Sequence, residues 1–153
     1  MIAELNVKQI LLDKCTQYIH QRIDSIQKKL DEIAEAQNSE TKSSAGDKHE
    51  TGRTMMQLET QKMTVQLYAA LEVKQTLDQI LIDNKSTMVG LGSLVKCNTG
   101  NYYIAISSGK ILIEDVNYYA ISLQSPIGKL LSGKFKGDVV IFNKRQIKIL
   151  EII

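Results

Sequence analysis

The chain has 153 residues, the size of one ordinary domain or of a small domain with an extended appendage. Its charged fraction of 24% and hydrophobic fraction of 43% exclude a disordered chain, and a net charge of +2 favours no class of partner. No apolar run is long enough to span a membrane, and we expect no secretory signal. Two separated cysteines form no disulfide framework, so we expect a cytoplasmic protein without a membrane partner.

Charge and composition differ between the two halves of the chain. Residues 1–85 hold 11 lysine and arginine residues against 13 aspartate and glutamate residues, a net charge of −2. Residues 86–153 hold 8 against 4, a net charge of +4, together with seven of the nine glycines. The sequence therefore predicts two domains, 1–85 and 86–153.

The first domain is predicted to be an antiparallel coiled-coil hairpin. From Glu4 to about Gln37, apolar residues follow one narrow helical stripe, which consists of Leu12, Ile19, Ile23, Ile26, Leu30 and Ile33. From about Lys48 to Asp83, a second helix has a similar stripe of Met56, Met63, Leu67, Ala70, Leu77 and Leu81. Each helix would be about 50 Å long, and two helices of matched length favour pairing with each other.

The turn between the two helices is small and polar, as expected of a solvated loop at the far end of the hairpin. Together with the start of the second helix it forms the predicted tip, at about residues 38–50. A long hairpin with an exposed tip favours contact with a partner. Two alternatives are a hairpin that dimerises and a plain spacer.

The second domain is predicted to be a small antiparallel β-sheet with one short helix, so the expected fold class is α+β. The six candidate strands are residues 93–97, 102–107, 110–114, 118–124, 138–142 and 147–152. Before the fifth strand, Ser125 as N-cap, Pro126 at the first helical position and Gly133 just past the end predict a helix. We expect the aromatic side chains of this domain to serve in the core and in cross-strand packing; they are Phe135, Phe142, Tyr102, Tyr103, Tyr118 and Tyr119.

Side chains suited to catalysis are scarce, and we expect no active site formed by this chain alone. The sequence has no serine-histidine-aspartate set, no phosphate-binding glycine loop and no zinc-ligand spacing. At the tip, Asp47 as N-cap and Glu50 three residues later have the spacing of a capping box. The alternative is that their two carboxylates share a divalent cation such as Mg²⁺ with another macromolecule.

The second domain carries six basic side chains, which are Lys129, Lys134, Lys136, Lys144, Arg145 and Lys148. One interpretation is a nucleic-acid patch. Because the domain has a net charge of only +4 and no aromatic stacking motif, a solvated surface is at least as good an interpretation.

Two motifs resemble those of the Gre-type transcript-cleavage factors, which act as elongation factors of bacterial RNA polymerase. One is segment 125–140, SPIGKLLSGKFKGDVV, and the other is Gly46-Asp47-x-x-Glu50. The resemblance covers essentially the whole chain and implies a coiled coil followed by an FKBP-like domain. It implies a monomer that is not itself an enzyme. Its tip would enter the secondary channel of the polymerase and stimulate the polymerase's own cleavage of backtracked RNA.

The resemblance also implies roles for individual residues. Family members use two tip acids to help the polymerase hold a second Mg²⁺ near the 3′ end of backtracked RNA, and by position this role falls to Asp47 and Glu50. No cofactor would be held stably by the chain alone. The candidate contacts to polymerase are Arg53, Ser125, Pro126, Ile127, Gly133 and Lys134.

The tip departs from the family directly after Glu50. The chain has Thr51-Gly52-Arg53-Thr54 where the family usually has Asn-x-Glu-Tyr, so a base replaces an acid. Two further hypotheses therefore stay open. One is a channel-binding regulator or inhibitor of the same architecture that does not promote cleavage, and the other is a coiled-coil scaffold unrelated to transcription.

Overall fold

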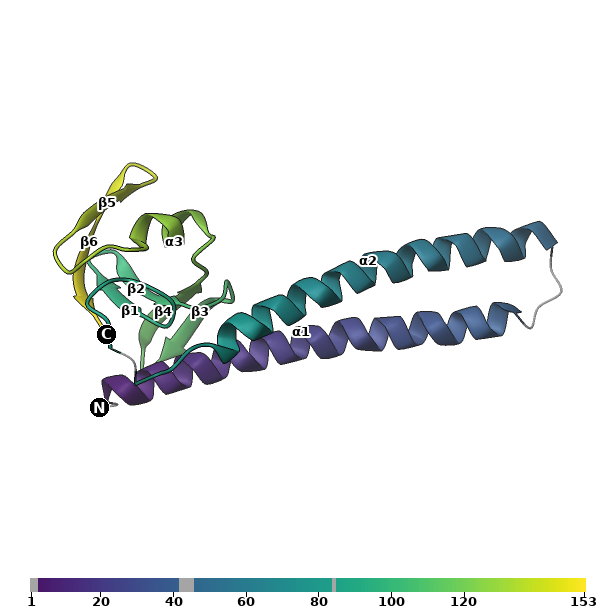
Figure 1. Ribbon diagram of the computed structural model, residues 1–153, viewed down its shortest axis with the longest axis horizontal. Helices are drawn as coiled ribbons and strands as arrows, with labels where there is room; N and C mark the ends of the chain where they lie inside the picture. Colours follow the sequence, from purple (N-terminus) through teal and green to yellow (C-terminus); the bar gives the residue numbers. More distant parts are fainter. Residues whose placement is uncertain (1–2, 42–45, 84) are drawn as a thin grey trace. The chain divides into compact units, whose positions relative to one another are not determined.

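The computed structural model describes residues 3–41, 46–83 and 85–153, and Figure 1 shows their arrangement. In chain order, the elements are α1 (Glu4–Thr41), α2 (Gly46–Asp78), β1 (Leu94–Cys97), β2 (Gly100–Ile104), β3 (Gly109–Ile113), β4 (Val116–Ile121), α3 (Pro126–Leu131), β5 (Val139–Phe142) and β6 (Arg145–Ile152). Each predicted helix and strand is present, with ends that differ by a few residues. The α+β class is confirmed.

The chain divides into two compact units. Ile19–Lys74 forms one, called here the hairpin unit, and Met1–Tyr18 together with Gln75–Ile153 forms the other, called the sheet unit. This division does not follow the change of composition at residue 85. The start of α1 and the end of α2 belong to the sheet unit. No helix within the described ranges is long and apolar enough to cross a membrane.

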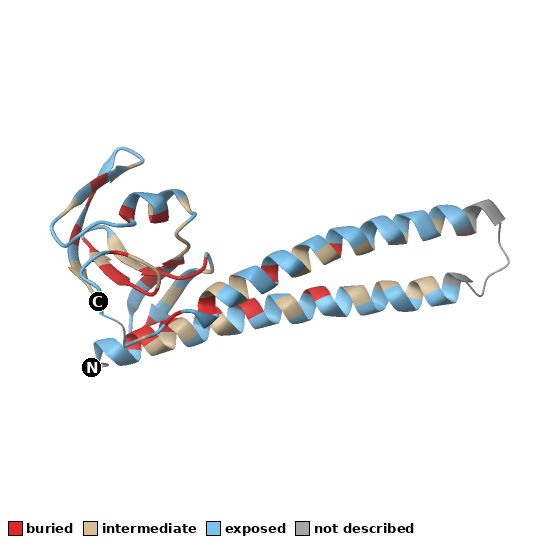
Figure 2. Cartoon of the chain, viewed as in Figure 1, coloured by how far each residue is buried: buried red, intermediate tan, exposed pale blue. Residues whose placement is uncertain are grey.

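The hairpin unit consists of antiparallel stretches of α1 and α2 that bury one stripe on each helix (Figures 1 and 2). Ile26 on α1 and Met63 and Ala70 on α2 are at most 5% exposed. Ile33 and Met56, each one heptad nearer the turn, are half-buried. The predicted seam is confirmed here, and burial decreases towards the turn.

The end of α2 differs from the prediction. The helix ends at Asp78, and Leu81, placed in the seam by the heptad pattern, is 66% exposed. Ile80 is the buried residue instead, and a β-carbon added to Gly92 would lie 3.1 Å from Ile80 Cγ2. Ile80 thus packs within the sheet unit, two residues beyond the end of the helix.

The sheet has six strands in the order β3-β4-β2-β1-β6-β5. The expectation of an antiparallel sheet is wrong for one pair, because β2 and β4 run parallel, with Tyr102 beside Tyr119. Positive φ angles at Glu114 and Asp115 give the tight turn that joins β3 to β4 as a hairpin. Strand β4, the second strand of this hairpin, pairs with β2 and runs parallel to it. Strand β3 lies on the other side of β4, at the edge of the sheet.

A contiguous core lies within the sheet unit. Its buried side chains are Val89, Val95, Cys97, Ile104, Leu131, Val140, Ile147 and Ile149. Phe142 packs against this core, and Tyr103 and Tyr118 are buried, as expected of core aromatic residues. Phe135 is 50% exposed and so lies outside the core, although its backbone forms an isolated β-bridge with Met88.

The first turns of α1 bury a stripe that the heptad pattern did not predict. Val7, Leu11 and Cys15 recur at four-residue steps and are at most 9% exposed, whereas the predicted Leu12 is only half-buried. Lys8 Nζ donates a hydrogen bond of 3.2 Å to the carbonyl oxygen of Ile153. These residues tie α1 to the sheet unit.

Helix α3 follows from local chemistry, as predicted. The Ser125 hydroxyl accepts a hydrogen bond from the backbone N–H of Gly128 at 3.1 Å and donates one to the Ser122 carbonyl at 2.7 Å. Pro126 occupies the first helical turn, and Gly133 adopts a positive φ of 76° just beyond the helix. A β-carbon at Gly128 would overlap the backbone carbonyl oxygen of Ser122.

We predict that Gly128→Ala lowers the free energy of unfolding by about 2 kcal/mol or more, because the added methyl group forces α3 away from Ser122. Urea denaturation of the full chain measures the effect. Gly90→Ala is the matched control, since a β-carbon there meets nothing within 4 Å. Equal losses in the two variants would reject the steric role of Gly128.

Candidate functional site

The two predicted tip acids, Asp47 and Glu50, are the second and fifth residues of α2. Because α2 begins at Gly46, Asp47 is inside the helix and is not its N-cap, contrary to the capping-box interpretation. The side chain of Asp47, and any cap that it makes, lie outside the described residues. Glu50 is exposed, and its backbone carbonyl accepts a hydrogen bond of 3.0 Å from the Thr54 hydroxyl. Residues three apart on a helix lie on one side, so both acids start from the same side of α2.

Charges near the tip act in opposite directions on a bound cation. The amino-terminal end of a helix carries a partial positive charge, which stabilises carboxylates in its first turn. Arg53 is exposed and follows Glu50 by three residues, so it neighbours Glu50 on the helix surface. The carboxylates attract a divalent cation, and the guanidinium group of Arg53 repels it.

The tip acids are too few to form a complete metal site. Among the described residues, no three or more histidine, cysteine, aspartate or glutamate side chains come together as metal ligands. Mg²⁺ prefers six oxygen ligands and is usually held in proteins by one or two carboxylates together with waters and substrate phosphates. Two carboxylates would therefore need further ligands from elsewhere to hold such an ion.

The other five predicted contact residues gather around α3. Ser125 is engaged in the helix cap, and Ile127 packs against the core of the sheet unit. The backbone of Gly133 donates to the Val89 carbonyl at 2.9 Å, and the Lys134 carbonyl accepts from the Val89 N–H at 2.8 Å. The side chains of Lys134 and Pro126 are exposed. Of this group, those two side chains have the most surface to offer a partner.

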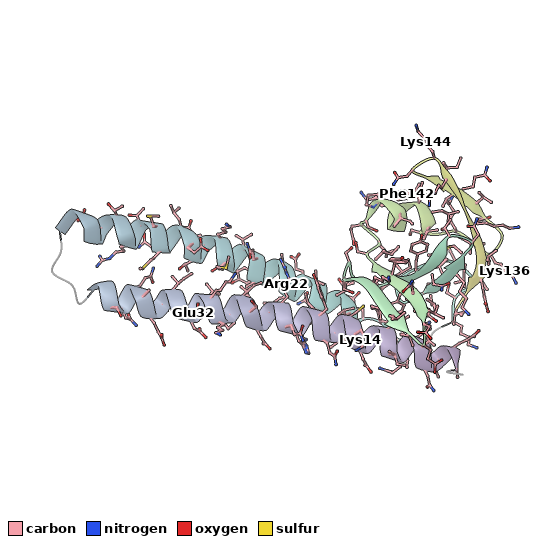
Figure 3. The ribbon with its side chains drawn as sticks, turned by 180° about the vertical axis from the view of Figure 1, so that it is seen from behind. Lys14, Arg22, Glu32, Lys136, Phe142 and Lys144 are labelled. Carbon is pink, nitrogen blue, oxygen red and sulfur yellow. The ribbon has the colours of Figure 1, made fainter. Side chains whose placement is uncertain are left out.

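The exposed surface of α3, β5 and β6 is both basic and apolar. All six predicted basic side chains are exposed, and Figure 3 labels Lys136 and Lys144 among them. Val139 and Ile141 of β5 are 51% and 66% exposed, and Val139 lies beside Lys148 of β6. Sequence reasoning missed these two apolar residues, because all four residues of β5 are apolar and alternation does not reveal the outer face.

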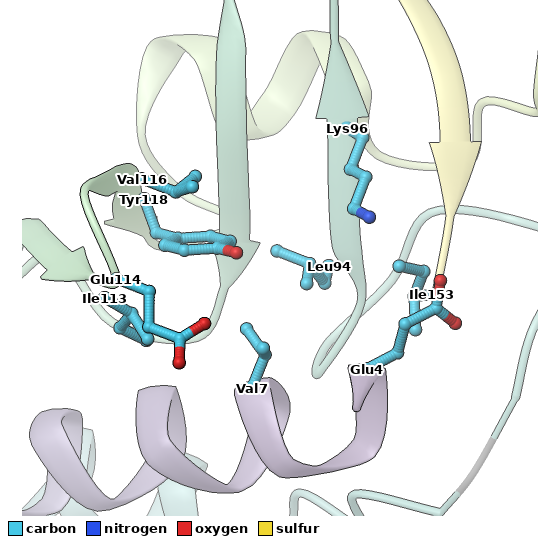
Figure 4. Close-up of a pocket in the computed structure, with 9 residues that line it drawn as sticks. All are labelled: Glu4, Val7, Leu94, Lys96, Ile113, Glu114, Val116, Tyr118 and Ile153. Atoms are coloured by element: carbon cyan, nitrogen blue, oxygen red, sulfur yellow. The ribbon is translucent and has the colours of Figure 1, made fainter. Parts of the chain in front are cut away.

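A cavity of about 280 Å³ lies within the sheet unit, between the first turns of α1 and the sheet (Figure 4). Val7, Leu94 and Tyr118 contribute its apolar lining, and the carboxylates of Glu4 and Glu114 border it. Its volume is just below the range typical of ligand sites, and it is lined by no histidine, cysteine or serine. The polar groups of its lining are the Lys96 amine, the Tyr118 hydroxyl and the two glutamate carboxylates.

The buried polar side chains beside α1 are suited to structure rather than to catalysis. Burial raises the pKa of the Cys15 thiol, although a hydrogen bond between its Sγ and the Ser108 hydroxyl, 3.7 Å apart, acts in the opposite direction. Burial likewise raises the pKa of Cys97, to about 11, and that of Tyr103. A protonated, buried thiol is a poor nucleophile.

A scan of the chain against models of protein families gives no match, and a search of curated proteins gives none either.

We predict that Cys15 and Cys97 react with a thiol reagent at least about a hundredfold more slowly in the folded chain than after unfolding in urea, because both are buried and protonated. Release of chromophore from Ellman's reagent measures the rate. Ser25→Cys on the exposed surface of α1 provides a reference thiol that should react at once. Fast labelling of native Cys15 would contradict its assigned burial.

Proposed function

We propose that the chain is a bacterial transcription elongation factor of the Gre type. In this proposal the hairpin enters the secondary channel of RNA polymerase, and the tip stimulates cleavage of backtracked RNA by the polymerase itself. The observation that carries the proposal is the placement of Asp47 and Glu50 within the first five residues of α2, at one end of a helical hairpin. The sheet unit, for which we propose an FKBP-like fold, would dock outside the channel.

The chemistry of phosphodiester cleavage supports this role for the tip. Hydrolysis with two metal ions needs one ion to activate water and a second to stabilise the leaving oxygen. The polymerase would hold one Mg²⁺ itself, and Asp47 and Glu50 would supply ligands for the other. The chain would need no active site of its own, which suits the scarcity of catalytic residues in its sequence.

The dimensions of α2 support entry into a narrow channel. The part of α2 within the hairpin unit, from Gly46 to Lys74, is about 43 Å long at 1.5 Å per residue. Two paired helices are only about 20 Å across, so a hairpin of this length can carry two carboxylates into a deep opening.

The surface of α3, β5 and β6 supports docking of the sheet unit. Pro126 and Lys134 are exposed beside α3, and Val139 and Ile141 add apolar area on β5. A mixed surface of this kind, with basic groups around apolar side chains, suits an acidic protein rim.

We expect Asp47→Asn and Glu50→Gln each to lower the stimulated cleavage rate at least about tenfold, because each removes one oxygen charge from the shared Mg²⁺ site. The measurement is RNA cleavage in backtracked elongation complexes assembled with purified bacterial RNA polymerase. Glu32→Gln is the matched control, since Glu32 is an exposed acid of α1 away from the first turn of α2 (Figure 3). A wild-type chain that does not bind polymerase would contradict the proposal.

A second candidate function rests on Arg53. Its positive charge beside Glu50 weakens attraction for a divalent cation, so the chain would occupy the channel as a regulator without promoting cleavage. Binding to polymerase without any increase in cleavage would establish this alternative in place of the first proposal.

If Mg²⁺ binds at the tip, Arg53→Glu should raise the cleavage rate at limiting Mg²⁺ by about threefold or more, because a repulsive charge beside Glu50 becomes attractive. Titration of Mg²⁺ in the cleavage assay measures this shift. Arg22→Glu, a charge reversal at an exposed position of α1, should leave the titration unchanged. An unchanged titration for Arg53→Glu would remove Arg53 from any electrostatic role at the metal.

A further inference from the structure

The outer face of α2 in the hairpin unit carries apolar side chains that are largely exposed. Met55, Leu58, Val65 and Tyr68 are 66%, 60%, 69% and 65% exposed, respectively. At 100° per residue, Leu58, Val65 and Tyr68 lie roughly 120–160° around α2 from the buried Met63 and Ala70, and Met55 lies at the edge of the same band, about 60–80° from them. This band is called here the outer stripe.

The outer face of α1 in the same unit is different. From residue 19 to residue 39, the exposed side chains are polar or charged except for Ala34, and they include Arg22 and Glu32, labelled in Figure 3. A position facing solvent does not by itself account for the apolar residues of the outer stripe, because the solvent-facing residues of the neighbouring helix α1 are polar or charged. Exposed apolar patches of a few hundred Å² mark interaction sites in soluble proteins.

The spacing of the outer stripe is symmetric along α2. Leu58 and Val65 form an inner pair, Met55 and Tyr68 lie three residues outside it, and the midpoint of both pairs falls between Gln61 and Lys62. A two-fold axis through this midpoint, perpendicular to the helix, places Leu58 opposite Val65 of a second copy. The same axis places Met55 opposite Tyr68 of that copy. An isologous interface requires such self-complementarity.

The angular positions of the four residues agree with an oblique crossing of two helices. Leu58 and Val65 lie near the middle of the stripe, and Met55 and Tyr68 lie on its two opposite flanks. Two antiparallel helices bring these opposite flanks together at their ends when they cross obliquely with a positive angle, the hand of a left-handed coiled coil. Both the inner and the outer pairs can then be buried at once.

Charges beside the outer stripe are also complementary under the same symmetry. Lys62 and Glu59 are exposed on the same flank of α2, near the midpoint. In the antiparallel arrangement, Lys62 of one copy lies beside Glu59 of the other, and the pairing occurs twice. The two Lys62 side chains lie near each other at the axis, and the two Glu59 carboxylates offset the repulsion between them.

The area of the outer stripe is suitable for a dimer. Taking about 200 Å² for a whole side chain of this size, the four residues present on the order of 500 Å². A standard interface buries about 800 Å² on each partner, and the exposed neighbours Thr54, Gln61, Lys62 and Ala69 can supply the remainder.

We infer that α2 is a homodimerisation surface, on which two copies of the chain pack antiparallel through the outer stripe around a two-fold axis between Gln61 and Lys62. The dimer exists in equilibrium with a monomer, because an interface on a single helix face is near the lower limit of size. This inference does not rest on the proposed role in transcription. If that role holds, the monomer is the form that enters the channel, and the dimer is a resting form.

A disulfide test examines the register of the two helices. Two Gln61 α-carbons would lie about 6 Å apart across the axis, within the range of a disulfide, so Gln61→Cys should give a covalent dimer under mild oxidation. Met55→Cys is the matched control, because its two copies would be about 20 Å apart along the antiparallel helices. The native Cys15 and Cys97 stay in place, since both are buried. Equal cross-linking of the two variants would contradict the antiparallel register.

Sedimentation of the full-length chain tests the affinity. The weight-average mass should rise from monomer towards dimer between about 1 and 200 µM, and Leu58→Lys and Val65→Lys should each weaken association at least about tenfold. Gln21→Lys, which adds the same charge on the outer face of α1, should leave it unchanged. Circular dichroism confirms that each variant stays helical. A wild-type chain that remains monomeric throughout, or a dimer insensitive to both α2 substitutions, would overturn the inference.

Discussion

The burial of two different stripes on one helix is the constraint on which the rest of the structure depends. Helix α1 presents Val7, Leu11 and Cys15 at four-residue steps to the sheet unit, and then a heptad series that includes Ile26 to α2. The orientation of one stripe relative to the other around the helix axis is fixed by the number of residues between them. One residue inserted between the two stripes would rotate them by about 100° relative to each other, so one core would lose its contribution from α1. Both units therefore depend on an uninterrupted α1.

Segment 125–140 illustrates how a motif can be conspicuous for reasons of folding. Ser125 caps α3, Gly128 allows the helix to pass the Ser122 carbonyl, and Gly133 takes a positive φ where the chain turns back to Val89. These requirements hold whatever the protein binds. The resemblance carried by this segment consequently bears more on the fold of the sheet unit than on its partner. Evidence on function has to come from the tip of the hairpin.

Periodicity and turn chemistry were enough to predict every helix and strand, because both are local properties of the sequence. Pairing between strands is not local, and the sequence contained no signal that the β3–β4 hairpin would add to β2 through β4. The heptad pattern also suggested Leu81 as a seam residue, whereas tertiary packing selected Ile80. The extension of the sheet unit into α1 was missed for a similar reason, since Leu11 and Leu12 are both apolar and only the packed structure distinguishes them.

The candidate site was predictable only in part. The positions of Asp47 and Glu50 at the start of α2 followed from spacing, whereas the start of the helix at Gly46 removed the predicted N-cap. Ser125 and Gly133 were recognisable as helix signals, and their hydrogen bonds agree with those signals. The outward side of β5 was not predictable, because Val139 and Ile141 alternate with equally apolar residues whose burial depends on β6.

The hydrogen bond between Lys8 and Ile153 has a consequence for the order in which the chain folds. It joins residues 145 positions apart, and β1 in turn pairs with β6, so the sheet unit depends on contacts between distant parts of the sequence. The hairpin unit needs only neighbouring segments, and contacts of this kind form quickly. During synthesis on the ribosome, α1 and α2 can pair while the later strands are still being made. Until β6 emerges, Val7 and Leu11 have no complete sheet to cover them, which makes this interval the one in which the nascent chain is most exposed to aggregation.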